Sequence, residues 1–194
     1  MIQLNNVSIF LTANGRALIS DISFTLNSGD RTVIIGEEGN GKSTLLKLIA
    51  DPALIEDHAE YTGFINRGRH RIGYLSQELE PCERGMRVCD FMALDPGNSW
   101  LAESIASEVG LDTGLIHETR AMDTLSGGER VKLRIVRLLM DEPDMLLLDE
   151  PTNDLDLETL VWLEDLIKNF EGGVLFVSQP WESAEGLYFL PKKD

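Results

Sequence analysis

The residues from 36 to 43 follow the pattern G-x-x-x-x-G-K-S, which is typical of loops that hold a chain of phosphates. Glycines let successive backbone N–H groups turn inward toward phosphate oxygens. The lysine can reach the outer phosphates, and the serine hydroxyl can ligate Mg²⁺. We therefore predict a nucleoside triphosphate site with Mg²⁺, formed by Gly36, Glu37, Glu38, Gly39, Asn40, Gly41, Lys42, Ser43 and the adjoining Thr44.

The segments on either side of this loop support the prediction. An apolar strand at 31–35 leads into it, and a helix with apolar residues at helical spacing, 42–50, follows it. The start of that helix adds its positive end to the site. Glu37 and Glu38 place two acids on a loop built for a polyanion. Because the backbone does the binding, we expect these two side chains to point away.

Two carboxylates end a second apolar run. Residues 145–148 show no alternation, which predicts a buried strand, and Asp149 and Glu150 follow directly. Open α/β sheets place their ligand chemistry at the carboxyl ends of strands. Asp149 suits Mg²⁺, directly or through water, and Glu150 suits the general base that polarises an attacking water. Alone, the pair would fit an ordinary strand end; beside the phosphate loop, it predicts catalysis.

The remaining pattern predicts the elements that position these residues. Helical patterns replace strands between about 81 and 124, which indicates a small helical lobe. Ser126 and Glu129 form a capping box that begins a long amphipathic helix. Strands alternating with helices predict an α/β fold with a mainly parallel central sheet. The other predicted strands are 2–10, 19–26, 61–65, 72–75 and 174–178, and the other predicted helices are 87–94, 99–109 and 157–170.

Composition narrows the classes of partner. The formal net charge of −16 disfavours loose binding to nucleic acid or anionic membrane. The alternating Arg67, Arg69 and Arg71 predict a strand with one solvated face rather than a basic patch. No apolar run reaches the roughly 20 residues that span a bilayer, and we expect that the protein has no secretory leader. We expect a cytoplasmic protein without direct membrane insertion, whose Cys82 and Cys89 are free thiols.

Several motifs resemble those of ATP-binding cassette (ABC) ATPases. Residues 125–130, Leu-Ser-Gly-Gly-Glu-Arg, resemble the ABC signature motif, and Gln77 resembles the Q-loop glutamine. Residues 150–156 resemble the passage from the Walker B motif into the D-loop, and 156–164 resemble the ABC-F branch in particular. The resemblance implies a P-loop NTPase fold with an N-terminal antiparallel β region and a small helical subdomain. It implies a single ABC ATPase domain over 1–194, with a nucleotide-binding core at 1–80 and 125–194 and the sublobe at 81–124.

The resemblance also implies where ATP and Mg²⁺ lie. ATP would sit between the phosphate loop of one cassette and Ser126, Gly127 and Gly128 of a second cassette, in a head-to-tail dimer. A helix start offers unpaired N–H donors, which agrees with this placement. Gln77 would join Ser43 and Asp149 at the metal, and the catalytic residues would be Lys42, Gln77, Glu150 and Gln179. Phe10 stands where the family keeps an aromatic residue that stacks on adenine, although the role of an edge-strand core residue fits nearly as well.

The resemblance leaves several functions open. The first is an ABC-F-like ATPase whose closing on ATP drives a conformational change in a partner, such as the ribosome. The second is the nucleotide-binding subunit of a membrane transporter, which would pair with a transmembrane subunit. The third is a slow or non-hydrolysing nucleotide-gated regulator, which only Gln179 and Glu38 favour. The second cassette is either an identical copy or a partner cassette.

The chain departs from the family in two ways. Gln179 stands where the family keeps a histidine that contacts the γ-phosphate, and glutamine cannot carry charge. The hypothesis is slow hydrolysis, which a turnover comparison with Gln179→His tests; equal rates refute it. ABC-F proteins carry two linked cassettes, whereas we expect one cassette and no linker here. Residues 180–194 do not resemble the family's next helix; a terminal strand is favoured, and an artificial end is the alternative.

Overall fold

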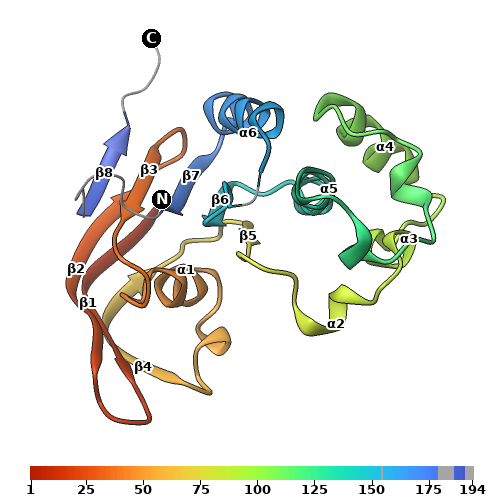
Figure 1. The fold of residues 1–194 in the computed structure, drawn as a ribbon. Coiled ribbons are helices and arrows are strands. Elements are labelled where there is room, and N and C mark those ends of the chain that lie inside the picture. The colour runs from red at the N-terminus through yellow and green to blue at the C-terminus, as the bar shows by residue number, and fades with distance from the viewer. Residues whose placement is uncertain (154, 179–185, 191–194) are drawn as a thin grey trace. The chain divides into compact units, whose positions relative to one another are not determined.

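The computed structural model describes residues 1–153, 155–178 and 186–190 (Figure 1). In these ranges the strands are β1 (Ile2–Leu11), β2 (Ala17–Leu26), β3 (Arg31–Ile35), β4 (Ala59–Asn66), β5 (Ile72–Leu75), β6 (Met145–Asp149), β7 (Gly173–Ser178) and β8 (Gly186–Leu190). The α-helices are α1 (Lys42–Ala50), α2 (Pro81–Arg84), α3 (Val88–Met92), α4 (Ser99–Glu108), α5 (Gly127–Leu139) and α6 (Leu157–Asn169). Short 3₁₀ turns lie at Pro52–Leu54, Leu115–His117 and Met122–Thr124.

The chain divides into two compact units. The core unit comprises Met1–Ser76, Pro143–Pro151 and Lys168–Asp194, and the helical unit comprises Gln77–Glu142 and Thr152–Ile167. The helical unit extends beyond the predicted 81–124 lobe. It takes in α5 because this helix buries its apolar face among the residues of α3 and α4.

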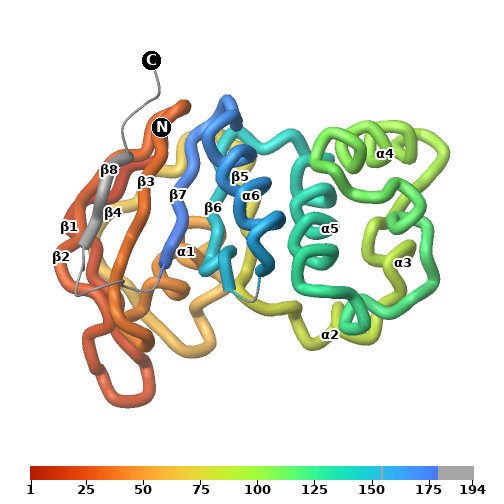
Figure 2. Tube along the Cα trace, turned by 45° about the horizontal axis from the view of Figure 1, so that its top comes forward, coloured from red at the N-terminus to blue at the C-terminus, as the bar shows by residue number. Residues whose placement is uncertain are grey.

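A five-stranded sheet organises the core unit, in the order β5-β6-β7-β3-β8. Figure 2 shows β5, β6, β7 and β3 side by side. The first four strands are parallel, and β8 pairs antiparallel with β3. Every residue of β6 is buried, as its lack of alternation predicted. The mainly parallel sheet is confirmed, and the predicted terminal strand exists as β8. All four parallel strands end at one edge, which is where their following loops meet.

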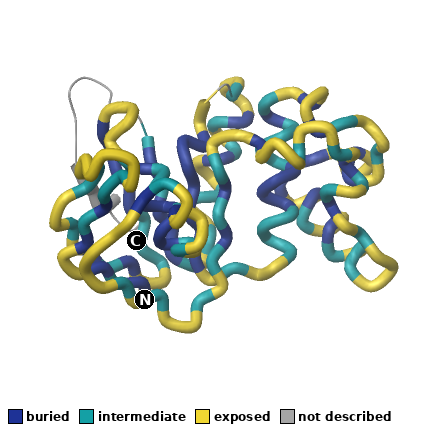
Figure 3. Tube along the Cα trace, turned by 90° about the horizontal axis from the view of Figure 1, so that it is seen from below, coloured by how far each residue is buried: buried dark blue, intermediate teal, exposed yellow. Residues whose placement is uncertain are grey.

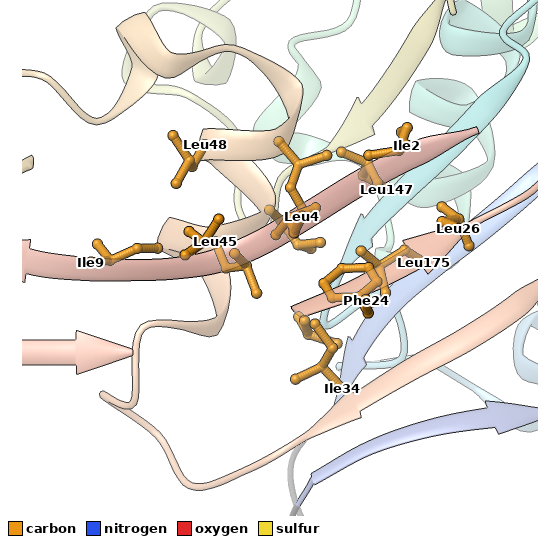
Figure 4. Close-up of a cluster of buried hydrophobic side chains, with 14 of the residues drawn as sticks. Ile2, Leu4, Ile9, Phe24, Leu26, Ile34, Leu45, Leu48, Leu147 and Leu175 are labelled. Atoms are coloured by element: carbon orange, nitrogen blue, oxygen red, sulfur yellow. The ribbon is translucent and has the colours of Figure 1, made fainter. Parts of the chain in front are cut away.

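A second sheet in the core unit is antiparallel, with the order β2-β1-β4. It confirms the predicted N-terminal antiparallel region. Helix α1 packs under the strands: Leu45 and Leu48 join Leu4, Leu147 and Leu175 in one buried cluster (Figure 4). Each of these leucines is at most 1% exposed, so each contributes about 1.5–3 kcal/mol of burial. The cluster holds α1, and with it the end of the 36–43 loop, in place.

The helical unit has an apolar cluster of its own. Leu133 and Val136 of α5 are fully buried with Met92 of α3 and Ala102 of α4. Buried segments occur in both units, and most connecting loops are exposed (Figure 3). The apolar residues that predicted an amphipathic helix at α5 are therefore residues that this cluster buries.

One predicted strand is wrong. The alternating arginines at 67–71 lie in a turn, because β4 ends at Asn66. Gly68 adopts a positive φ of 59°, and its N–H donates to the Asn66 side-chain carbonyl at 3.0 Å. The Arg67 side chain donates instead to the Ala50 carbonyl oxygen, at the end of α1. Alternation of charge alone therefore did not indicate a strand.

Candidate active site

The 36–43 loop connects β3 to α1, as predicted, and its backbone requires glycine at two positions. Gly39 and Gly41 both have a φ of +79°, in the left-handed region. A Cβ atom on Gly41 would also lie 2.7 Å from Cβ of Leu18. Gly41 is the residue before the first turn of α1, whose leading N–H groups have no intrahelical acceptor. This backbone fits the predicted phosphate cradle.

The Lys42 side chain folds back over the loop. It is 6% exposed, and its Nζ donates to the carbonyl oxygens of Gly36 at 2.5 Å and Glu37 at 2.8 Å. The ammonium group is therefore held at the loop that it is predicted to serve. Glu37 and Glu38 are exposed to solvent, which reduces their repulsion of a bound anion.

Ser43 and Asp149 meet in the core unit. The Ser43 hydroxyl donates to Asp149 Oδ1 at 2.9 Å, and the Tyr74 hydroxyl donates to Oδ2 at 3.2 Å. Asp149 is only 2% exposed. Its burial raises the pKa of its carboxyl, and the hydrogen bonds from Ser43 and Tyr74 oppose that rise. A hydroxyl and a carboxylate oxygen side by side are the hard oxygen ligands that Mg²⁺ prefers.

Glu150 follows β6 in a strained conformation. Its φ is +45°, and it is 7% exposed. A non-glycine residue in this region costs about 1–3 kcal/mol, and such residues cluster at functional sites. The strain fits the predicted general base, because a fixed carboxylate at the end of a buried strand needs no reorganisation before accepting a proton.

The signature residues begin α5 in the helical unit. The Ser126 backbone N–H and hydroxyl both donate to Glu129 Oε2, at 2.9 and 2.8 Å, and the Glu129 N–H donates back to Ser126 Oγ at 3.3 Å. These bonds confirm the predicted capping box, and they lower the pKa of Glu129, the backbone N–H contributing most. Gly128 is close-packed, since a Cβ there would lie 2.5 Å from Thr159 Oγ1.

The other predicted site residues are less defined. Gln77 follows β5 by two residues and belongs to the helical unit. Phe10 lies half-buried in β1, opposite Ala17 and Glu60. A cavity of about 550 Å³ adjoins the loop, and Phe10 is not among its lining residues. The adenine-stacking role of Phe10 and the metal role of Gln77 stay predictions, and Gln179 lies outside the described residues.

Sequence reasoning missed three contributors. The hydroxyl of Tyr74 binds Asp149 because β5 and β6 are parallel neighbours with Tyr74 opposite Leu147. Leu18 packs against Gly41, which no local pattern indicates. Asp156 caps α6 by accepting from the Thr159 N–H at 2.8 Å, and this bond lowers the pKa of Asp156. An acid three residues before Thr159 at a helix start was the available signal.

Comparison with known proteins decides the family. The family model described as ABC transporter matches residues 19–153. The chain belongs to the ABC family. Members of this family are ATPases that bind and hydrolyse ATP, so the predicted family is confirmed. No helix in the described part of the chain is long and apolar enough to cross a bilayer.

Curated relatives and solved structures agree with the ABC assignment. ATP-binding protein Uup of Escherichia coli is 36% identical over 169 residues, covering 85% of this chain and 26% of Uup. ATP-binding cassette sub-family F member 2 of Bos taurus is 32% identical over 182 residues, covering 92% of this chain and 28% of that protein. The ABC domain thus spans little more than a quarter of these relatives, and its resemblance to ABC-F cassettes is confirmed.

Solved ABC structures share the fold. An inward-facing ABC transporter of metal-chelate type matches with a TM-score of 0.68 and 26% identity, over 91% of this chain and 72% of that chain. A cobalt transport ATP-binding protein matches with a TM-score of 0.67 and 25% identity, over 94% of this chain and 72% of that chain. The ABC domain is therefore homologous both to ABC-F proteins and to transporter nucleotide-binding subunits.

Proposed function

We propose that this ABC domain binds Mg-ATP on the loop from Gly36 to Thr44 and hydrolyses it with Glu150 as general base. The observation that carries the proposal is the 2.9 Å hydrogen bond from Ser43 to the buried Asp149, directly beside a loop with two left-handed glycines. Ser43 and Asp149 would hold Mg²⁺, which would supply positive charge against the charge that develops on the phosphates, and Gln77 is the third proposed ligand.

Lys42 and Glu150 supply the phosphate-binding ammonium group and the general base of the proposed reaction. The Lys42 ammonium donates to two loop carbonyls, and it would exchange them for phosphate oxygens, which form stronger, charge-assisted bonds. Glu150 accepts the proton of the attacking water. Gln179 would donate a neutral hydrogen bond near the terminal phosphate, which supports the slow turnover already hypothesised. Phe10 is proposed to stack on the adenine.

The proposed active unit contains two cassettes. The phosphate loop of one faces Ser126, Gly127 and Gly128 of the other, and the first N–H groups of α5 bind the terminal phosphate. Without the second cassette, half of the phosphate charge has no donors. The second cassette is an identical copy or a partner cassette, and closing on ATP is the mechanical step.

The proposed output is an ABC-F-like conformational change in a cytoplasmic partner. The similarity to Uup and to sub-family F member 2 favours this function, and the ribosome is the partner class that the ABC-F resemblance implies. Service as the nucleotide-binding subunit of a membrane transporter is the second candidate, which the similarity to transporter structures favours. Co-purification distinguishes them: ribosomes support the first, and a membrane protein supports the second.

The variant Glu150→Gln tests the shared-site mechanism. Removing the base should abolish hydrolysis while ATP still binds, so the variant should accumulate as a dimer with ATP and Mg²⁺. Size-exclusion chromatography with light scattering reads the mass, and wild-type protein with ADP is the control. A monomer under all nucleotide conditions, or unchanged turnover, would contradict the proposal.

A further inference from the structure

The helical unit exposes a tryptophan that the proposed function does not use. The Trp100 side chain is 66% exposed, more than any other aromatic side chain in the described ranges. Its indole Nε1–H donates to the Gly97 carbonyl oxygen at 3.0 Å, which holds the ring in one orientation. Tryptophan is enriched among the residues that contribute most to protein–protein binding, because its large ring buries much apolar area.

Trp100 begins the outward face of α4. Ala102 and Ala106 of this helix are fully buried in the apolar cluster of the helical unit, so the opposite face of α4 is left to solvent. The exposed side chains recur every three or four residues, which places them on one face of a helix. They form a stripe, called here the α4 stripe, of Trp100, Glu103, Ser104, Ser107 and Glu108.

The charge along the α4 stripe has one sign. Residues 93–117 contain four carboxylates and no lysine or arginine. The four are exposed and belong to Asp95, Glu103, Glu108 and Asp112. Glu103 Oε1 is hydrogen-bonded to His117 Nε2 at 3.0 Å and to Ser99 Oγ at 3.3 Å, whereas Oε2 has no partner among the described residues. An aromatic face beside carboxylates attracts a cation.

The other tryptophan of the helical unit already has a cation over its ring. Nζ of Lys132 lies 5.3 Å from the centroid of the Trp162 ring, within the distance of a cation–π contact, about 6 Å. Within the part of the chain that the structure describes, no lysine or arginine lies over the Trp100 ring in this way. Trp100 therefore offers an oriented ring whose cation would have to come from another molecule.

We propose that the α4 stripe is a docking surface for a basic segment of a partner protein. An arginine or lysine of that segment lies over the Trp100 ring, and Glu103 pairs with its charge. Charge complementarity selects this occupant, since the four carboxylates would repel an acidic segment or the phosphates of a nucleic acid. The proposal does not depend on ATP binding, because every residue that carries it belongs to the helical unit.

Two short peptides test whether the Trp100 ring binds a cation. One alternates arginine with glycine, and the other has citrulline for each arginine, which keeps the shape but removes the charge. NMR follows the indole Nε1–H signals during each titration, and loss of a signal in Trp100→Leu assigns Trp100. That signal should shift saturably with the arginine peptide only. The Trp162 signal should move little, because Lys132 already lies over its ring.

Calorimetric titration with the arginine peptide then separates this surface from general attraction to an acidic chain. Trp100→Leu should weaken binding at least about threefold, and Trp100→Phe should weaken it less, because phenylalanine keeps an aromatic face. Glu103→Gln should weaken binding at least about twofold. Glu60→Gln is the matched control and should have a smaller effect, because it changes an equally charged, exposed residue on β4 of the core unit.

Four results would overturn the proposal. One is a Trp100 signal that neither peptide shifts, and another is equal binding of the arginine and citrulline peptides. The others are an affinity in Trp100→Leu equal to that of wild-type protein, and equal losses in Glu103→Gln and Glu60→Gln. Either of these last two would show that the net charge of −16 attracts the peptide without a contribution from the α4 stripe.

Discussion

At the scale of single residues, two glycines of the 36–43 loop allow the cost of a left-handed φ to be measured apart from the cost of a steric clash. Gly39 and Gly41 share a φ of +79°, yet a Cβ on Gly39 would meet nothing within 4 Å, whereas one on Gly41 would lie 2.7 Å from Leu18. The left-handed region costs a residue with a Cβ about 1–2 kcal/mol. The contact with Leu18 adds a second cost at Gly41 only, because Cβ of Leu18 is fixed to its backbone.

Alanine at these two positions should therefore have unequal effects. Gly39→Ala should lower the free energy of unfolding by about 1–2 kcal/mol. Gly41→Ala should lower it by about 1–3 kcal/mol more, because a clash adds to the strain. Urea denaturation without nucleotide measures both, so ligand binding does not confuse the comparison. Equal losses would show that Leu18 moves aside freely.

At the scale of elements, much of the site follows from local patterns and some does not. The buried run before Asp149 and the apolar strand before Gly36 placed two motifs at the ends of parallel strands, as found. Tyr74 was missed because its direction depends on the register between β5 and β6, which a single sequence does not encode locally. The strand predicted from the alternating arginines at 67–71 is wrong because the hydrogen bond between Gly68 and Asn66 forms a turn there.

The capping box at the start of α5 predicts how the free energy of unfolding depends on pH. Hydrogen bonds from Ser126 lower the pKa of Glu129, the backbone N–H contributing most. A lowered pKa adds stability above the unfolded value of about 4.5, and this contribution is lost as pH falls through the folded pKa. The unfolding free energy of wild type should exceed that of Glu129→Gln at pH 7, and the difference should shrink below about pH 4.5.

The control for the cap is Glu108→Gln, which changes the same charge at the end of α4, outside the cap. Urea titrations at pH 7 and pH 4 give the two differences. A gap between wild type and Glu129→Gln that is constant with pH, or that is matched by Glu108→Gln, would show that the cap gains nothing from ionised Glu129.

At the scale of the whole molecule, charge governs association. Each chain carries −16, and the proposed dimer would bring two such chains and their nucleotides together. Their repulsion acts over the Debye length, about 30 Å at 0.01 M salt and about 10 Å at 0.1 M. The same charge argues that a ribosomal partner would be met through basic protein surfaces rather than through RNA.

Salt should therefore strengthen the proposed dimer. With Glu150→Gln and saturating Mg-ATP, raising NaCl from about 0.02 M to about 0.2 M should lower the dimer dissociation constant severalfold, because the ions screen like charges. Analytical ultracentrifugation measures the constant. Dissociation on adding salt would indicate that opposite charges hold the interface, contrary to this expectation.

The proposed function depends on the binding of ATP to the 36–43 loop, and one affinity comparison tests that binding. Lys42→Ala removes a buried ammonium, so ATP should bind about ten- to a hundredfold more weakly, as expected for a lost charged hydrogen bond. Lys47→Ala, on the last turn of the same helix, should change the affinity less than about threefold. Calorimetric titration with Mg-ATP measures all three proteins. If Lys42→Ala binds ATP as tightly as wild type, the loop does not hold the phosphates and the proposed site is wrong.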